Sequence, residues 1–307
     1  IERPDGGDGA RHLGPFPNNE PHPEKSGLFL HLNTNKRGLT LDLKTNEARA
    51  IVTELVRDVD VVVESFRPGT MAGFGLDYDS LKAINPNLVM TSISNFGQTG
   101  PYRDYKGSEI IFYGMGGELG STGLEDRDPV KMGGTVGMYQ AGAVAAVATM
   151  GALFAAREQQ VGQHVDVSIM ETQIGSIDRR MSLLLAYQYT GAVSRRAALG
   201  STGSYPTGVY PTRDGYVEVT GGLGRFPGVV EMIGTPEALK DPKWYTAEAQ
   251  SDPDLSEEFE EHFIPWCLER SKQDVWHEAQ KSRVLSGPLN TMEELADDPH
   301  FKDRAAF

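Results

Sequence analysis

The sequence predicts an α/β protein with a doubly wound, Rossmann-like large domain and a smaller α+β domain. Between Gly27 and Gly200, short apolar runs alternate with runs of helical spacing, which is typical of βα units around a mostly parallel sheet. Residues 195–211 are instead rich in Gly, Ser, Thr and Pro. The chain of 307 residues is long enough for two hydrophobic cores, since a domain usually has roughly 100–150 residues.

The elements of the first half follow from their apolar spacing. Residues 46–56 have the spacing of a helix and follow Thr45, a residue type that commonly caps helices. The β-branched run 59–63 predicts a strand, and residues 87–94 predict another. A long alanine-rich helix is predicted at 138–157. Helix and strand therefore alternate here, as a doubly wound fold requires.

The second half begins with a strand at 164–168 and a long helix at 170–189, and then changes character. A hairpin and two acidic helices should follow, at residues 208–210, 216–220, 255–266 and 272–282. We therefore divide the chain into a large domain, a linker with a glycine-rich loop, a small domain and a segment returning to the large domain, at 1–190, 191–204, 205–287 and 288–307.

Charge and cysteine content exclude several classes of partner. The 29 Lys and Arg residues against 43 Asp and Glu residues give a formal charge of −14, which argues against a nucleic-acid partner. Cys267 is the single cysteine, and no Cys/His spacing resembles a metal site. The most apolar run, 141–156, is shorter than the roughly 20 residues of a membrane span. We expect a cytoplasmic protein with no metal, nucleic-acid or membrane partner.

Common catalytic signatures do not occur in the sequence. It contains no phosphate-binding loop, no Gly-x-Gly-x-x-Gly fingerprint after a strand, no His-Glu-x-x-His pair and no Gly-x-Ser-x-Gly elbow. The missing motifs argue against ATP-dependent, NAD-dependent and serine-hydrolase chemistry. The glycines of 114–123 and 221–224 are more typical of turns than of nucleotide-binding loops.

A series of segments in a fixed order is more informative: Ile1-Glu2-Arg3-Pro4 and residues 33–43, 60–69, 75–78, 92–101 and 162–168. Together they resemble the family III CoA-transferases, and the resemblance covers nearly the whole chain. It implies the two-domain fold given above and an interlocked dimer. It also implies that a first strand–helix unit and a C-terminal continuation of the family lie outside these 307 residues.

The resemblance implies a binding site for coenzyme A as a substrate, with no permanently bound cofactor. CoA carries three phosphate groups, so basic side chains should gather at one pocket despite the acidic total. The basic candidates are Arg3, Lys36, Arg37, Lys44, Arg67, Arg103 and Lys106. Positions that line the CoA site in the family are occupied by Arg3, Leu41, Lys44, Ser65, Phe66 and Lys106. Any single one of these cations is as often exposed to solvent without a ligand as it is part of a binding site, so the prediction rests on the whole set.

The resemblance also implies a ping-pong transfer of CoA from an acyl-CoA to a carboxylic acid. An aspartate attacks the thioester, and the mixed anhydride becomes an enzyme–CoA thioester before the second acid receives the CoA. By resemblance this nucleophile falls on Met138, whose thioether cannot form an anhydride. Glu109 falls on an acidic position beside the catalytic centre and is the best remaining carboxylate. A glycine-rich flap over the active site, or a plain linker, is predicted at Gly200, Ser201, Thr202 and Gly203.

Four interpretations of function stay open. The chain is an active transferase using Glu109 or a relocated carboxylate, or the non-catalytic subunit of a heteromeric transferase. It is a CoA-ester-binding protein without turnover, or an enzyme similar to α-methylacyl-CoA racemase, which needs a histidine and an aspartate. Ser108 and Met138 stand at those two positions, so racemisation is disfavoured. The predicted partners are an acyl-CoA, a carboxylic acid, and a second copy of the chain or a related subunit.

Overall fold

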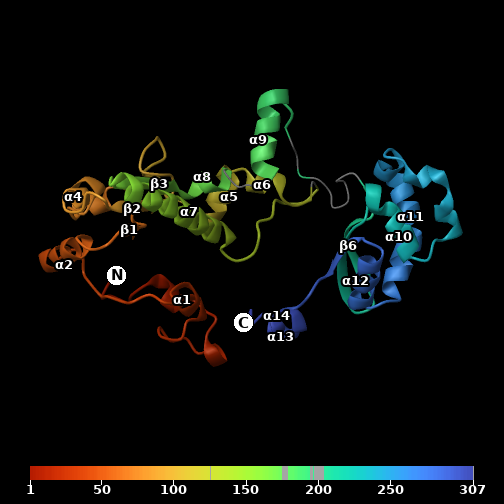
Figure 1. Ribbon diagram of the computed structural model, residues 1–307, viewed down its shortest axis with the longest axis horizontal. Helices are drawn as coiled ribbons and strands as arrows, with labels where there is room; N and C mark the ends of the chain where they lie inside the picture. The colour runs from red at the N-terminus through yellow and green to blue at the C-terminus, as the bar shows by residue number, and fades with distance from the viewer. Residues whose placement is uncertain (125, 175–178, 194–195, 197–203, 307) are drawn as a thin grey trace. The chain divides into compact units, whose positions relative to one another are not determined.

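The computed structural model describes residues 1–124, 126–174, 179–193, 196 and 204–306 (Figure 1). The chain forms two compact units, which are described separately below. The first comprises Ile1–Gly120 and Lys131–Ser194, and the second Ser121–Val130 and Arg195–Phe307. The first holds a parallel sheet and the second an antiparallel one, both accompanied by helices. The predicted α/β class is confirmed.

The sheet of the first unit has three parallel strands in the order β1 (Val61–Glu64), β2 (Val89–Ser94) and β3 (Gln163–Ser168). Val89 in β2 pairs with Val61 on one side and with Gln163 on the other. β2 is buried along almost its whole length, as expected for the central strand of a parallel sheet covered by helices. All three strands lie within one or two residues of their predicted positions.

Helix α7 (Val136–Gln159) packs against β2 and β3 through a stripe of small residues. Thr149 in this stripe shares a buried hydrogen bond of 2.7 Å with the hydroxyl of Thr91 in β2. Small side chains at three- and four-residue spacing let the helix lie close to the sheet. The buried residues of the stripe are Gly137, Ala141, Ala145, Thr149, Ala152 and Ala156.

Within the described residues, α7 is also the one helix long and apolar enough to cross a membrane, by length and composition alone. A single such helix is weak evidence for a membrane segment, because core helices of globular domains satisfy the same criteria. The predicted absence of a membrane partner and the predicted compartment stay predictions.

The other helices of the first unit are mostly short. The structure places α1 at Gly27–Leu32, α2 at Asn46–Val56, α3 at Thr70–Gly73, α4 at Tyr78–Lys82, α5 at Glu109–Met115, α8 at Ile169–Ile174 and α9 at Arg179–Thr190, with α6 (Glu118–Ser121) at the boundary between the units. The single helix expected at 170–189 is thus described as two helices, and residues 175–178 lie outside the described part. Thr45 caps α2 as predicted, because its hydroxyl accepts the N–H of Ala48 at 3.2 Å.

The second unit has an antiparallel sheet of β4 (Thr207–Thr212), β5 (Gly215–Thr220) and β6 (Leu285–Pro288). The predicted hairpin and both predicted acidic helices are confirmed, whereas β6 was not expected. An aromatic core that includes Trp244, Phe259 and Phe263 fills the space between sheet and helices. The helices are α10 (Phe226–Met232), α11 (Pro253–Leu268), α12 (Lys272–Lys281), α13 (Met292–Asp297) and α14 (Pro299–Asp303).

Lys272 links the start of α12 to α13 and to the segment before it. Its side chain is 6% exposed, and its ammonium group pairs with Glu294 of α13 at 2.7 Å and donates to the carbonyl of Leu289 at 2.9 Å. A cation this buried needs such partners to offset its lost hydration. The predicted domain boundaries, including the return of 288–307 to the large domain, stay predictions.

Candidate functional site

Two neighbouring pockets lie at the carboxyl ends of the parallel strands. The N-terminal pocket, of about 370 Å³, is lined by parts of residues 1–8 and 41–44 together with Ser65, Phe66 and Phe74. The strand-end pocket, of about 780 Å³, is lined by the segments that follow β1, β2 and β3 and by Met138. Ser65 and Phe66 belong to both. This edge is where ligands bind in open α/β sheets, because the connecting loops diverge there.

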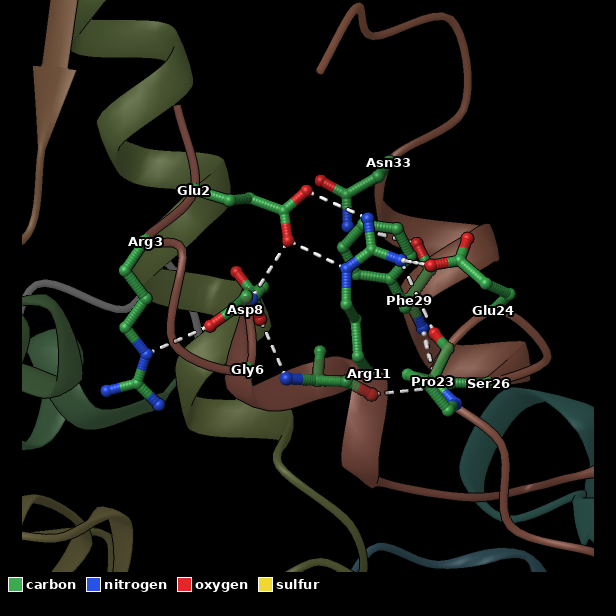
Figure 2. Close-up of polar contacts among 12 residues, drawn as sticks. Glu2, Arg3, Gly6, Asp8, Arg11, Pro23, Glu24, Ser26, Phe29 and Asn33 are labelled. Atoms are coloured by element: carbon green, nitrogen blue, oxygen red, sulfur yellow. Dashed lines mark hydrogen bonds and ion pairs between the residues drawn. The ribbon is translucent and has the colours of Figure 1, made fainter. Parts of the chain in front are cut away.

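The N-terminal pocket depends on an ion pair that fixes the first loop of the chain (Figure 2). The guanidinium of Arg11 contacts both oxygens of Glu2, at 2.7 and 2.8 Å, and its carbon lies 3.8 Å from the ring centroid of Phe29. The hydrogen bonds from Arg11 lower the pKa of Glu2 to about 2. Glu2 also pairs through its backbone with Leu39 and Leu41. The loop is thus held from both sides.

The fixed loop places Arg3 on the wall of the N-terminal pocket. The Nε of Arg3 donates to the carbonyl of Gly7 at 3.1 Å, and this contact uses one of the three guanidinium nitrogens. Leu41 and Phe66 add apolar surface, and Lys44 adds a second cation. The lining also contains three carboxylates: Glu2 pairs with Arg11, and Asp8 and Asp42 each accept a backbone N–H. Apolar side chains beside Arg3 and Lys44 suit a flat, phosphate-bearing group such as a nucleotide.

Glu64 orients the residues that the two pockets share. Its side chain is 9% exposed, and its Oε2 accepts the backbone N–H of Phe66 at 2.7 Å. The bond ties the backbone of Phe66 to the end of β1, next to the two residues that line both pockets. The Phe66 ring then packs edge-on against Phe74 at 6.2 Å between centroids.

Met138 lies half-buried in the first turn of α7 and lines the strand-end pocket. Its backbone N–H donates to the carbonyl of Thr135 at 3.0 Å. Glu109, at the start of α5, contacts Gly137, the residue before Met138: its Oε1 accepts the backbone N–H of Gly137 at 2.8 Å. Its Oε2 pairs with Lys131 at 3.0 Å, and the side chain is 12% exposed. Both oxygens of Glu109 are therefore engaged.

The strand-end pocket is cationic although the whole chain is acidic. Of the described residues that line it, Arg67, Arg103 and Lys106 are cations and Asp104 is the one carboxylate. Three of the seven basic candidates thus line this pocket, two line the N-terminal pocket and two line neither, so the expected gathering at one CoA pocket stays a prediction. Across the same described ranges, no three His, Cys, Asp or Glu side chains are grouped so as to hold a metal ion.

The structure brings most of the predicted site residues together. The N-terminal pocket collects Arg3, Leu41, Lys44, Ser65 and Phe66, and the strand-end pocket collects Ser65, Phe66, Lys106 and Met138. Glu109 is outside both lining sets but contacts the neighbour of Met138. The predicted flap of Gly200, Ser201, Thr202 and Gly203 lies outside the described residues.

The strand-end pocket is also lined by Asn95, Tyr105 and Ile169, which were not among the predicted site residues. Asn95 and Ile169 directly follow two of the predicted parallel strands. The rule that ligands bind at the carboxyl ends of such strands was the signal that could have found them.

Comparison with known proteins gives a consistent result. Residues 1–307 match the family described as CoA-transferase family III. The chain is 34% identical over 278 residues to the succinyl-CoA–D-citramalate CoA-transferase of Chloroflexus aurantiacus, covering 90% of this chain and 68% of that protein. It is 30% identical over 312 residues to the succinyl-CoA–L-malate CoA-transferase alpha subunit of the same organism, covering 100% and 71%.

A solved structure, that of a CAIB/BAIF family protein from Brucella suis, superposes with a TM-score of 0.83 at 31% identity, over 99% of this chain and 79% of that one. The agreement extends over the whole chain, in sequence and in fold. The protein is a member of CoA-transferase family III.

Proposed function

We propose that this chain is the non-catalytic subunit of a heteromeric CoA-transferase, supplying CoA-binding surface while a related chain supplies the nucleophilic carboxylate. The observation that carries this proposal is Met138 on the wall of the strand-end pocket, where the family resemblance puts the nucleophile. A thioether has no oxygen to attack a thioester and form an anhydride. The relative of Chloroflexus aurantiacus named an alpha subunit supports the division into unlike chains.

The carboxylates near Met138 are poor substitutes for that nucleophile. Glu109 uses one oxygen to accept the N–H of Gly137 and the other to pair with Lys131. Attack by Glu109 would first require breaking one of these contacts in a poorly hydrated site. Asp104 lines the pocket, but it is 75% exposed on a loop and lies 3.5 Å from Arg103.

The two pockets together suit an extended CoA ester. We assign the nucleotide to the N-terminal pocket, where Arg3 and Lys44 lie beside apolar side chains. The pantetheine arm then passes Ser65 and Phe66, which both pockets share, and the thioester reaches the strand-end pocket. Racemisation lacks support because Ser108 and Met138 provide neither of the two bases that it needs.

An exposed apolar face on α7 supports a protein partner. Val147 is 74% exposed and Phe154 is 64% exposed, two turns apart on the same helix. Surface of this kind commonly marks an interface. We assign it to the related subunit, consistent with the family's expected dimer, and sedimentation of the purified chain with and without such a subunit checks the assignment.

The nucleophile is tested by restoring it. We expect Met138→Asp to gain CoA exchange between succinyl-CoA and a second acid, at a rate roughly 10³-fold or more above the wild type. The matched control is Met138→Asn, which has the same shape as the aspartate variant but no nucleophilic oxygen. Mass spectrometry with and without hydroxylamine should find a cleavable adduct at position 138 of the aspartate variant only.

Two results would contradict this proposal. One is CoA exchange by the purified wild-type chain alone. The other is a hydroxylamine-sensitive adduct on Glu109 or Asp104 in the wild type, which would make the chain an active transferase with a relocated nucleophile.

A further inference from the structure

The loop between β2 and α5 is fastened to the first unit by aromatic side chains. Phe96 packs edge-on against Tyr102, Tyr105 and Phe112, with centroids 6.0, 6.4 and 5.6 Å away. The side-chain amide of Asn95 also donates to the carbonyl of Tyr105 at 3.4 Å. The loop is therefore a supported element, and it presents Arg103 to the strand-end pocket.

Arg103 reaches across to the loop that follows β1. Its Nη2 lies 3.5 Å from where a Cβ atom would stand on Gly69, which adopts the left-handed region with φ +86°. The N–H of Thr70 donates to the carbonyl of Arg67 at 3.0 Å and closes the turn around this glycine. Two guanidinium groups, those of Arg67 and Arg103, thus come to the same pocket from separate loops.

The contacts of Arg103 within the chain leave it able to bind a ligand. Its described ion pair, with the neighbouring Asp104, is 3.5 Å long, and the two side chains are 38% and 75% exposed. A pair of this length and exposure contributes little and is readily exchanged for a better partner. A planar guanidinium binds a carboxylate through two parallel hydrogen bonds, which gives both strength and orientation.

We propose that Arg103, together with Arg67, binds the distal carboxylate of a dicarboxylic acyl group whose thioester end lies beside Met138. This inference rests on the proposed function and adds a substrate class to it. The strand-end pocket contains three cations and one carboxylate among its described lining residues, in a chain of net charge −14. The two cations of the N-terminal pocket, Arg3 and Lys44, are left for the phosphates of CoA.

The test compares two unreactive thioethers of CoA that differ only at the end of the acyl mimic. S-butyl-CoA ends in a methyl group, and S-carboxypropyl-CoA ends in a carboxylate on a chain of similar length. We expect calorimetry to show that the wild type binds the carboxylate analogue about tenfold more tightly, as for one charge-assisted contact. Arg103→Met should abolish this preference and leave the affinity for S-butyl-CoA unchanged.

Two further variants frame this result. Arg103→Lys should retain part of the preference, because it keeps the charge but loses the planar fork. Arg57→Met is the matched control: Arg57 is 56% exposed at the end of α2 and pairs with Glu54, away from both sets of lining residues, so neither affinity should change.

The possible outcomes distinguish failure of the carboxylate site from failure of the proposed CoA-binding function. Equal binding of both analogues by the wild type overturns the carboxylate site but leaves a CoA-binding subunit, and this comparison needs no variant to fold. Equal loss of both analogues in folded Arg103→Met also overturns it, because the guanidinium would then bind a CoA phosphate. Failure of the wild type to bind either analogue overturns the proposed function itself.

Discussion

At the scale of single residues, Arg11 determines where the first cation of the N-terminal pocket lies. Its guanidinium holds both oxygens of Glu2, while the backbone of Glu2 pairs with Leu39 and Leu41. Arg3, which follows Glu2 in the sequence, is therefore held in a fixed position on the pocket wall. The charge of Glu2 is essential to this arrangement, because a neutral carboxyl accepts a weaker hydrogen bond from a guanidinium.

The pH dependence of stability should report on this pair. Arg11 lowers the pKa of Glu2 to about 2 in the folded chain, against about 4.3 in an unfolded one. A lowered folded pKa means that the pair stabilises the chain fully above about pH 4.3 and loses this effect as the pH falls toward 2. Thermal melts of the wild type and Glu2→Gln should differ by a constant amount above about pH 5 and converge below it.

A difference between the two melts that does not change with pH would contradict the assigned cause. So would equal melting temperatures at neutral pH, where the pair is fully formed.

Which side chains gather at the pockets was foreseeable only through the resemblance. Composition and periodicity point to no pocket, and Arg3 and Lys106 are far apart in the sequence. What could not be foreseen was the state of Glu109, because its contact with Lys131 depends on a loop after residue 130 for which the sequence has no strong pattern. The same holds for Arg103, whose approach to Gly69 is a tertiary contact.

At the scale of elements, prediction succeeded where a pattern was long and local. α7 extends only two residues beyond the predicted helix at each end, and β3 begins one residue early. β6 was missed because Leu285-Ser286-Gly287-Pro288 has no strand pattern, and pairing with β5 alone makes it a strand. α1 was missed because it has only six residues, too few for a period to show.

The start of β3 depends on a glycine that no larger residue can replace without a shift. A Cβ atom on Gly162 would lie 2.2 Å from the carbonyl oxygen of Leu88, which is backbone and cannot swing away. We expect Gly162→Ala to lower the free energy of unfolding by about 2–3 kcal/mol, as overpacking does. Urea denaturation followed by circular dichroism measures this change in the free energy of unfolding.

Gly142 is the matched control for this substitution. It lies within α7, and a Cβ atom there would meet nothing within 4 Å. Gly142→Ala should instead raise the free energy of unfolding by about 0.5–1 kcal/mol, because alanine restricts the unfolded chain. Equal effects of the two substitutions would refute the steric explanation.

At the scale of the whole molecule, each unit has its own core, and the second core encloses the one thiol. Cys267 is fully buried among aromatic and aliphatic side chains. Burial raises its pKa to about 12, because a thiolate would lose its hydration there. The length of the sequence and its change in composition at residues 195–211 predict two domains. The residues that form the core around Cys267 could be identified only from the structure.

This thiol should report on the opening of the second unit. At pH 8 we expect a disulfide reagent such as Ellman's to leave Cys267 unmodified in the native chain for hours, because the reactive thiolate is scarce and inaccessible. In urea the same thiol should react within minutes. Rapid labelling of the native chain would show that the second unit opens readily on its own, contrary to a packed core.

The attachment of α7 has a further consequence for how such a chain evolves. The helix is attached by its stripe of small residues, to which Met138 does not belong, and the backbone N–H of Met138 bonds to the cap residue Thr135 within the first turn. Under the proposed function, an aspartate-to-methionine change at position 138 removes the nucleophile and leaves the buried stripe that attaches the helix unchanged. The same proposal implies that, after a gene duplication, one copy can lose the acid at this position as long as the other copy retains it, and that each chain then needs the other for activity.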